Sequence, residues 1–157
     1  MTPSEVALAR HDEGFNCAQS VFSVFAEELG LPLPTAMRLA APFGGGIGHQ
    51  GEICGAATGA VMALGLRYGC PTPDKVRKAE TYEIATEFLR RFEDATGHRT
   101  CRDLIGYNLS TPEGLAAARE AQIFAKVCNG VIAAAAEIAA EMMQSPGITP
   151  AETSGAR

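Results

Sequence analysis

Hydrophobic residues along most of this chain recur every three or four positions, which is the spacing of helices that bury one face. No alternating run of β-branched residues is long enough to form a strand. The pattern therefore predicts an all-α protein, a single-domain helical bundle of about five to seven helices over residues 1–144. A flexible C-terminal tail is expected over residues 145–157, where Pro and Gly replace most apolar side chains.

Capping and helix-breaking residues set the expected helix boundaries. Asn16 followed by Gln19 is a capping-box pattern, and Gly69 and Gly97 each end a longer helix. In one of these helices small residues recur every four positions, which lets a neighbouring backbone approach closely. The expected helices are a leader at 6–10, then segments over about 16–29, 34–41, 51–68 and 72–96, a short one at Cys101, one opening at 110–113, and the last over 131–143.

Composition and charge narrow the function classes. A net charge of −5 and a pI near 5.2 argue against a nucleic-acid partner, which requires a basic face. The longest uncharged apolar run, residues 53–66, has fourteen residues and is too short to span a membrane. The first twelve residues carry charges and no apolar run, so no secretory signal is expected. These features predict a globular cytoplasmic protein.

Four of the five cysteines lie near expected helix starts. The free N–H groups at a helix start favour a thiolate over a thiol, so cysteine chemistry is the main interpretation. No C-x-x-C pair occurs, and any shared site must be assembled by tertiary packing. The alternative is that the thiols simply pack as small buried hydrophobes. The four are Cys17, Cys54, Cys101 and Cys128, whereas Cys70 follows a helix end and is the exception.

A glycine motif and three histidines are further candidates for functional residues. The segment 46–51 matches G-x-G-x-x-G, but no strand or parallel sheet is predicted around it, which argues against a dinucleotide site. His49 could donate a hydrogen bond to a ligand near Cys54 or serve as a spare ligand itself, although a surface or loop histidine is more common. His11 and His98 stand isolated in the sequence.

Six segments together resemble one bacterial and archaeal family of small redox-active proteins. Four of them carry the cysteines, and the other two are a glycine loop and a helix end. The resemblance to this C_GCAxxG_C_C family implies redox activity at Cys17, Cys54, Cys101 and Cys128. Cys70 is an extra cysteine, and Asn129 stands where the family often has proline. The segments are 14–19, 43–48, 54–59, 64–69, 101–104 and 127–128.

The leading hypothesis is a redox protein in which these four cysteines are the redox-active residues and the ligands of any metal or cofactor. Iron–sulfur electron transfer to an unidentified partner ranks above thiol/disulfide exchange, which needs no cofactor, because the sequence contains no close cysteine pair. If exchange operates, Cys54 is the expected attacking thiol. The alternative class is a helical binding module with structural zinc, or with merely packed cysteines, in which small-residue faces form a homodimer.

Overall fold

The computed structural model describes residues 1–147, and over these residues it is helical except for one isolated antiparallel bridge between Ile53 and Thr100. The all-α prediction is confirmed. Most of the predicted tail lies outside the described residues. The helices are α1 (Pro3–Asp12), α2 (Cys17–Ala26), α3 (Leu33–Ala40), α5 (Gly55–Tyr68), α6 (Lys75–Thr96), α7 (Cys101–Ile105), α8 (Pro112–Glu120) and α9 (Asn129–Gln144), with short turns at η1 (Ala41–Phe43) and α4 (Gly44–Ile47) and a π-helical turn at η2 (Phe124–Cys128).

The predicted count of five to seven helices is too low. Residues 1–147 contain eight α-helices of five residues or more, one for each expected segment, because even the short segments α1, α7 and α8 fold as helices of their own. Thr100 caps α7 through Asp103 N–H, and Thr111 caps α8 through Gly114 N–H. The predicted capping box at Asn16 is present at the start of α2.

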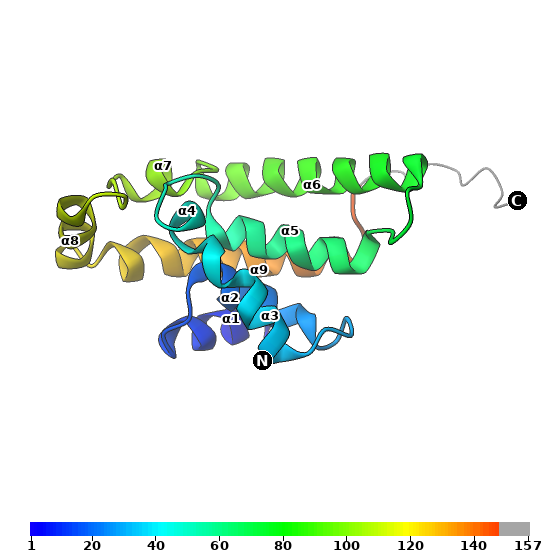
Figure 1. Cartoon of the computed structure of the whole chain (residues 1–157), viewed down its shortest axis with the longest axis horizontal. Coiled ribbons are helices and arrows are strands. Elements are labelled where there is room, and N and C mark those ends of the chain that lie inside the picture. The colour runs from blue at the N-terminus through cyan, green and yellow to red at the C-terminus, as the bar shows by residue number, and fades with distance from the viewer. Residues whose placement is uncertain (148–157) are drawn as a thin grey trace, which may run out of the picture.

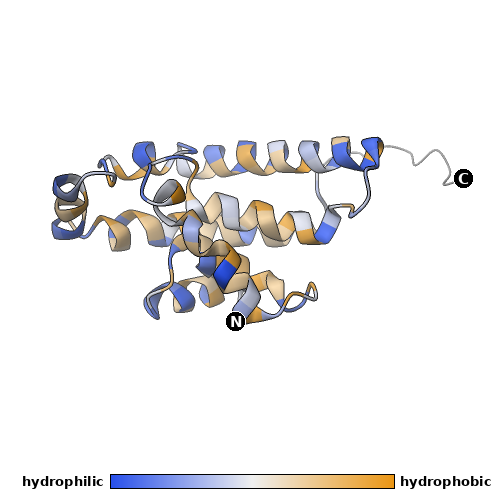
Figure 2. Ribbon diagram, viewed as in Figure 1, coloured by the Kyte–Doolittle hydropathy of each residue, from blue (hydrophilic) through white to orange (hydrophobic). Residues whose placement is uncertain are grey.

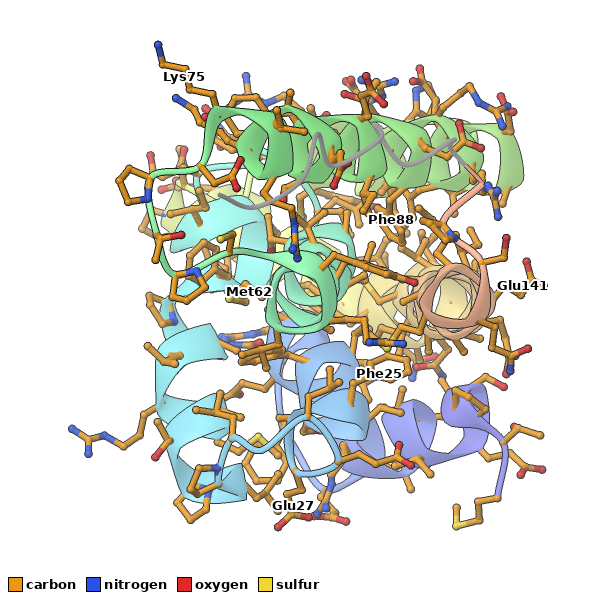
Figure 3. All side chains as sticks on the ribbon, turned by 90° about the vertical axis from the view of Figure 1, so that its right-hand side faces the viewer. Phe25, Glu27, Met62, Lys75, Phe88 and Glu141 are labelled. Carbon is orange, nitrogen blue, oxygen red and sulfur yellow. The ribbon has the colours of Figure 1, made fainter. Side chains whose placement is uncertain are left out.

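The helices form three layers (Figure 1). The middle layer is α5 beside α9, with α6 on one side and α1, α2 and α3 on the other. Seen from the end, Lys75 of α6 points outward and Phe88 points toward the middle layer (Figure 3). Hydropathy follows the layers, since α5 and α9 are mainly apolar whereas α6 alternates polar and apolar residues (Figure 2).

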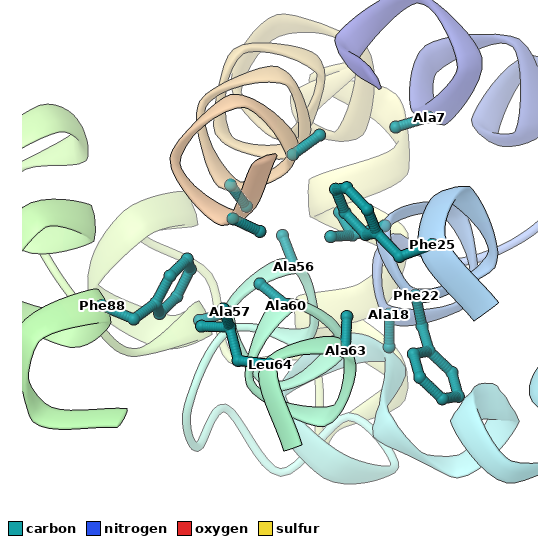
Figure 4. Close-up of a cluster of buried hydrophobic side chains, with 14 of the residues drawn as sticks. Ala7, Ala18, Phe22, Phe25, Ala56, Ala57, Ala60, Ala63, Leu64 and Phe88 are labelled. Carbon is teal, nitrogen blue, oxygen red and sulfur yellow. The ribbon is translucent and has the colours of Figure 1, made fainter. Parts of the chain in front are cut away.

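The core is built from small residues on α5 and larger ones on its neighbours (Figure 4). Ala56, Ala57, Ala60 and Ala63 are fully buried, which allows α2, α6 and α9 to pack close to α5. A Cβ at Gly59 would lie 2.6 Å from the Ala18 carbonyl oxygen, so only glycine permits this approach of α2. The small-residue face predicted from the sequence is therefore used within the chain. The expected helix start at residue 51 is wrong, since α5 begins at Gly55.

Among residues 1–147, no single helix is both long enough and apolar enough to cross a bilayer. One pair of helices, α8 and the continuous helix Phe124–Gln144, together has the length and apolar composition of a membrane span, but the two are bent by 69° relative to each other.

Candidate functional site

Four of the cysteines line a single cavity of about 470 Å³ at one end of the middle layer. Cys17 is the first residue of α2, Cys54 directly precedes α5, and Cys101 is the first residue of α7. Cys128 ends η2. Chain folding thus gathers four thiols that are remote in sequence. Cys70 does not line this cavity, and its sulfur lies 3.1 Å from the Thr72 hydroxyl oxygen.

Two expectations about local helix geometry are wrong. Cys54 lies just before α5, not one turn inside it, because the preceding residues form the bridge to Thr100. Cys128 is not at a free helix start, since its own φ of −64° and ψ of −33° are helical and η2 runs directly into α9. A residue in a continuous helix has no free N–H groups of a helix start around its thiol. Three of the four cysteines, not four, therefore have the predicted helix-start setting.

Backbone hydrogen bonds place Cys54 beside Cys101. The Cys54 N–H donates to the Arg99 carbonyl over 2.9 Å, and the Cys101 N–H donates to the Glu52 carbonyl over 2.8 Å. These two bonds pair the segment before α5 with the segment before α7, although the cysteines are far apart in the chain. The starts of two helices thereby face the same cavity.

The Arg102 side chain fastens the glycine loop to α7. Its Nε donates to the Gly51 carbonyl over 3.1 Å, and one terminal nitrogen donates to the Gln50 carbonyl over 2.9 Å. The same nitrogen lies 3.3 Å from a Glu52 carboxylate oxygen. Because these contacts join the loop to the residue after Cys101, they fix one wall of the cavity.

The glycine loop has an unusual backbone conformation over residues 45–49, where every φ is positive. Glycine adopts such angles without cost, but Ile47 and His49 do so as well. The loop is not a dinucleotide turn, since residues 1–147 contain no parallel sheet. Instead, the Gly45 N–H is one of the backbone groups that lower the pKa of Cys17.

Cys17 also approaches the start of α5 very closely. A Cβ at Gly55 would overlap the Cys17 sulfur and would lie 2.8 Å from the Phe43 carbonyl oxygen. The absence of a side chain at Gly55 lets the Cys17 sulfur lie against the first residue of α5, next to Cys54. The sequence could not show this approach, because α2, α3 and the glycine loop separate the two cysteines.

The thiols have strongly different proton affinities. The pKa of Cys17 is lowered to about 7, first by the Cys54 thiol donating to it and then by backbone N–H groups that include that of Gly45. The pKa of Cys54 is raised well above its ordinary value, first by this same interaction and then by burial. These opposite directions favour a thiolate at Cys17 over one at Cys54.

The other two cavity thiols stay protonated at neutral pH. Burial raises the pKa of Cys101 to about 11, with a further contribution from the charge on Cys17. Burial also raises the pKa of Cys128 to about 12, followed by the charges on Cys17 and Cys101. The directions of the pKa shifts favour Cys17 as the attacking thiol, whereas the sequence alone favoured Cys54.

Two histidines also line the cavity. His11 Nδ1 lies 2.9 Å from the side-chain oxygen of Asn129, 118 residues later in the sequence. The His49 ring packs on Gly45, where a Cβ would overlap it. His98 does not line the cavity. Sequence reasoning missed the His11–Asn129 contact, because nothing local links the last turn of α1 to the start of α9.

The arrangement of thiols differs from that of a single metal-ion site. Within residues 1–147, no three His, Cys, Asp or Glu side chains are grouped closely enough to hold one metal ion. Tetrahedral zinc requires sulfurs that converge on one point at about 2.3 Å, whereas an iron–sulfur cluster takes its cysteines on separate irons. The four cysteines line one cavity, so they are the residues that would hold a metal or a cluster.

Fold and site together define a class of protein, one that is helical over residues 1–147 and has four cysteines lining one cavity, with the pKa of Cys17 lowered. The family model described as "Putative redox-active protein (C_GCAxxG_C_C)" matches residues 15–142, and the chain belongs to this family. The resemblance inferred from the sequence is thereby confirmed. No curated protein and no protein of known structure shows a significant match to the chain.

Proposed function

We propose that this protein is a thiol/disulfide redox protein in which Cys17 is the attacking thiolate and Cys54 is the resolving thiol. The observation that carries the proposal is geometric: the Cys17 sulfur lies against Gly55, the residue after Cys54, and both thiols line one cavity. The directions of their pKa shifts favour the thiolate at Cys17. A thiol with a pKa near ambient pH combines a large thiolate fraction with good nucleophilicity. The two cysteines are distant only in the sequence. The lack of a close cysteine pair in the sequence is therefore no longer a reason to rank cluster chemistry above exchange.

The exchange proceeds in two displacements. The Cys17 thiolate attacks one sulfur of a substrate disulfide, forming a mixed disulfide, and the other substrate sulfur leaves with the bonding electron pair. Cys54 then loses its proton and attacks the Cys17 sulfur, releasing the second substrate thiolate. The substrate disulfide gains two electrons and two protons to become two thiols, while the two protein thiols become one disulfide. In a reducing cytosol, the dithiol would be the resting form.

The test uses reduced, anaerobically purified protein carrying Cys70→Ser, so that the half-exposed fifth thiol does not react. A chromogenic aromatic disulfide should release one coloured thiolate quickly and a second as Cys54 resolves the mixed disulfide. Cys17→Ser should slow the first phase by about tenfold or more, because the remaining cavity thiols are protonated. Cys54→Ser should stop after one release and leave a mixed disulfide on Cys17. A first phase unaffected by Cys17→Ser would refute the proposal.

A second candidate is an iron–sulfur centre, favoured by the fact that all four cysteines, not just two, line the cavity. Cys17, Cys54, Cys101 and Cys128 would hold it, and the bound group would supply one-electron transfer. The N–H groups near Cys17 favour the anionic sulfur that such ligation requires. Brown protein with stoichiometric iron and sulfide after anaerobic purification would support this candidate, and colourless protein with neither would favour exchange.

A further inference from the structure

The cavity contains a histidine whose ring is held in one orientation. His11, in the last turn of α1, is half-buried and lines the cavity together with the four thiols. Its Nδ1 lies 2.9 Å from the side-chain oxygen of Asn129, the residue that follows Cys128. This contact joins α1 to α9, which pack against each other.

The Asn129 contact determines which ring nitrogen of His11 carries the proton. An amide oxygen only accepts hydrogen bonds, so Nδ1 must donate and carry the hydrogen in the neutral ring. Nε2 is then the nitrogen with a free lone pair. A histidine fixed in this way can accept a proton without first reorienting or changing tautomer.

No other side chain of the cavity is as well suited to accept a proton. Its described lining includes no carboxylate, lysine or arginine, and the titratable groups besides the four thiols are His11 and His49. His49 belongs to the glycine loop, and within the described residues no hydrogen bond to its ring is present. His11 is therefore the nitrogen base that the fold holds in place.

We propose that His11 accepts the proton of the resolving thiol Cys54, directly or through one water, and that Asn129 holds the ring in the tautomer that leaves Nε2 free. The proposal rests on the exchange chemistry proposed above. The Cys54 proton moves to Nε2, the Cys54 sulfur forms a bond to Cys17, and the departing substrate thiolate takes the proton from the imidazolium. His11 and Cys54 line the same cavity and Cys54 is buried, so a base inside the cavity is the available acceptor for its proton.

The two-phase release of the coloured thiolate tests this role in protein carrying Cys70→Ser. His11→Gln should slow the second phase by about tenfold or more, because general base catalysis contributes at least that much. The first phase should change by less than about twofold, since Cys17 is already a thiolate near neutral pH. The control His98→Gln changes an exposed histidine outside the cavity and should leave both phases unchanged.

Variants of Asn129 separate ring positioning from a general structural effect. Asn129→Asp keeps an oxygen that accepts from Nδ1 and should preserve the second phase, whereas Asn129→Leu should slow it. If His11→Gln does not fold, the rate of the second phase in Asn129→Leu tests the role of His11 instead. An unchanged second phase in the folded variant refutes the role of His11 while exchange itself stands. A first phase that survives Cys17→Ser refutes exchange, so the two failures are distinguishable.

Discussion

At the scale of single residues, Gly55 controls how closely Cys17 approaches α5. Gly55→Ala should reduce the free energy of unfolding by roughly 1–3 kcal/mol, because the new Cβ overlaps the Cys17 sulfur and must displace α2. Urea denaturation measures the loss, and alkylation of Cys17 should slow in parallel.

Gly65 provides the matched control in the same helix. No atom lies within 4 Å of a Cβ built there, so Gly65→Ala should stabilise the protein by about 0.5–1 kcal/mol through helix propensity. Equal effects of the two substitutions would show that α2 and α5 do not meet as described.

The proton affinity of Cys17 gives a second prediction at this scale. In protein carrying Cys70→Ser, the rate of Cys17 alkylation by iodoacetamide should rise with pH around a midpoint near 7. Cys54→Ala removes the thiol that contributes most to this shift, so the midpoint should move up toward the ordinary value of 9.0. A midpoint that stays near 7 without Cys54 would contradict the proposed pairing.

At the scale of elements, Arg102 should determine the position of the glycine loop. Arg102→Ala removes the donors to the Gly51 and Gln50 carbonyls, which frees the loop whose Gly45 N–H stabilises the Cys17 thiolate. The alkylation midpoint of Cys17 should therefore rise.

Arg99→Ala is the control for the Arg102 substitution. The Arg99 side chain pairs with Glu93 of α6 and, within residues 1–147, makes no hydrogen bond to the loop, so its removal should leave the midpoint unchanged. If both variants behave alike, the effect of Arg102 is not exerted through the loop.

The same elements show what the sequence could and could not predict. The caps at Asn16, Thr100 and Thr111 are local patterns, and each correctly places a helix start. The left-handed run over residues 45–49 includes Ile47, whose β-branched side chain disfavours a φ of 64°, so propensity alone points away from it. The pair Asn129-Gly130 predicts a new helix start just after Cys128. In the structure η2 continues into α9 without a break, so this prediction is wrong.

At the scale of the whole molecule, the cavity thiols should make stability depend on pH in two opposite ways. The pKa of Cys17, about 7, lies below the ordinary 9.0, so the unfolded chain binds more protons and stability should rise from pH 7 to 9. The pKa values of Cys101 and Cys128, about 11 and 12, lie above 9.0, so stability should fall as pH rises beyond 9. Urea midpoints between pH 7 and 11 measure both trends.

The alkaline loss should be assignable to individual thiols. Cys101→Ala should reduce the loss between pH 9 and 11 by an amount on the order of 1–3 kcal/mol, since one pKa unit corresponds to 1.36 kcal/mol. Cys70→Ala should leave the alkaline slope unchanged, because that thiol lies outside the cavity. Part of the loss should remain, because the pKa of Cys54 is also raised above its ordinary value. An undiminished alkaline loss without Cys101 and Cys128 would mean that these two thiols are not buried as described.

The site was only partly predictable at this scale. Family resemblance selected the four cysteines, because the segments around them match a known pattern. Which two sulfurs meet depends on the packing of α2 on α5 through Gly55 and Gly59, which is a tertiary property. Asn129 stands where the family often has proline, and its side chain contacts His11. The sequence alone does not show this contact.

The central claim is that Cys17 and Cys54 form one redox pair. Mild oxidation of the reduced protein by a small-molecule disulfide, followed by proteolysis and mass spectrometry without reduction, reads the linkage directly. The predicted product is a single intramolecular disulfide between the peptides that contain Cys17 and Cys54. A product linking Cys101 to Cys128 instead, or one that leaves Cys17 as a free thiol, would contradict it.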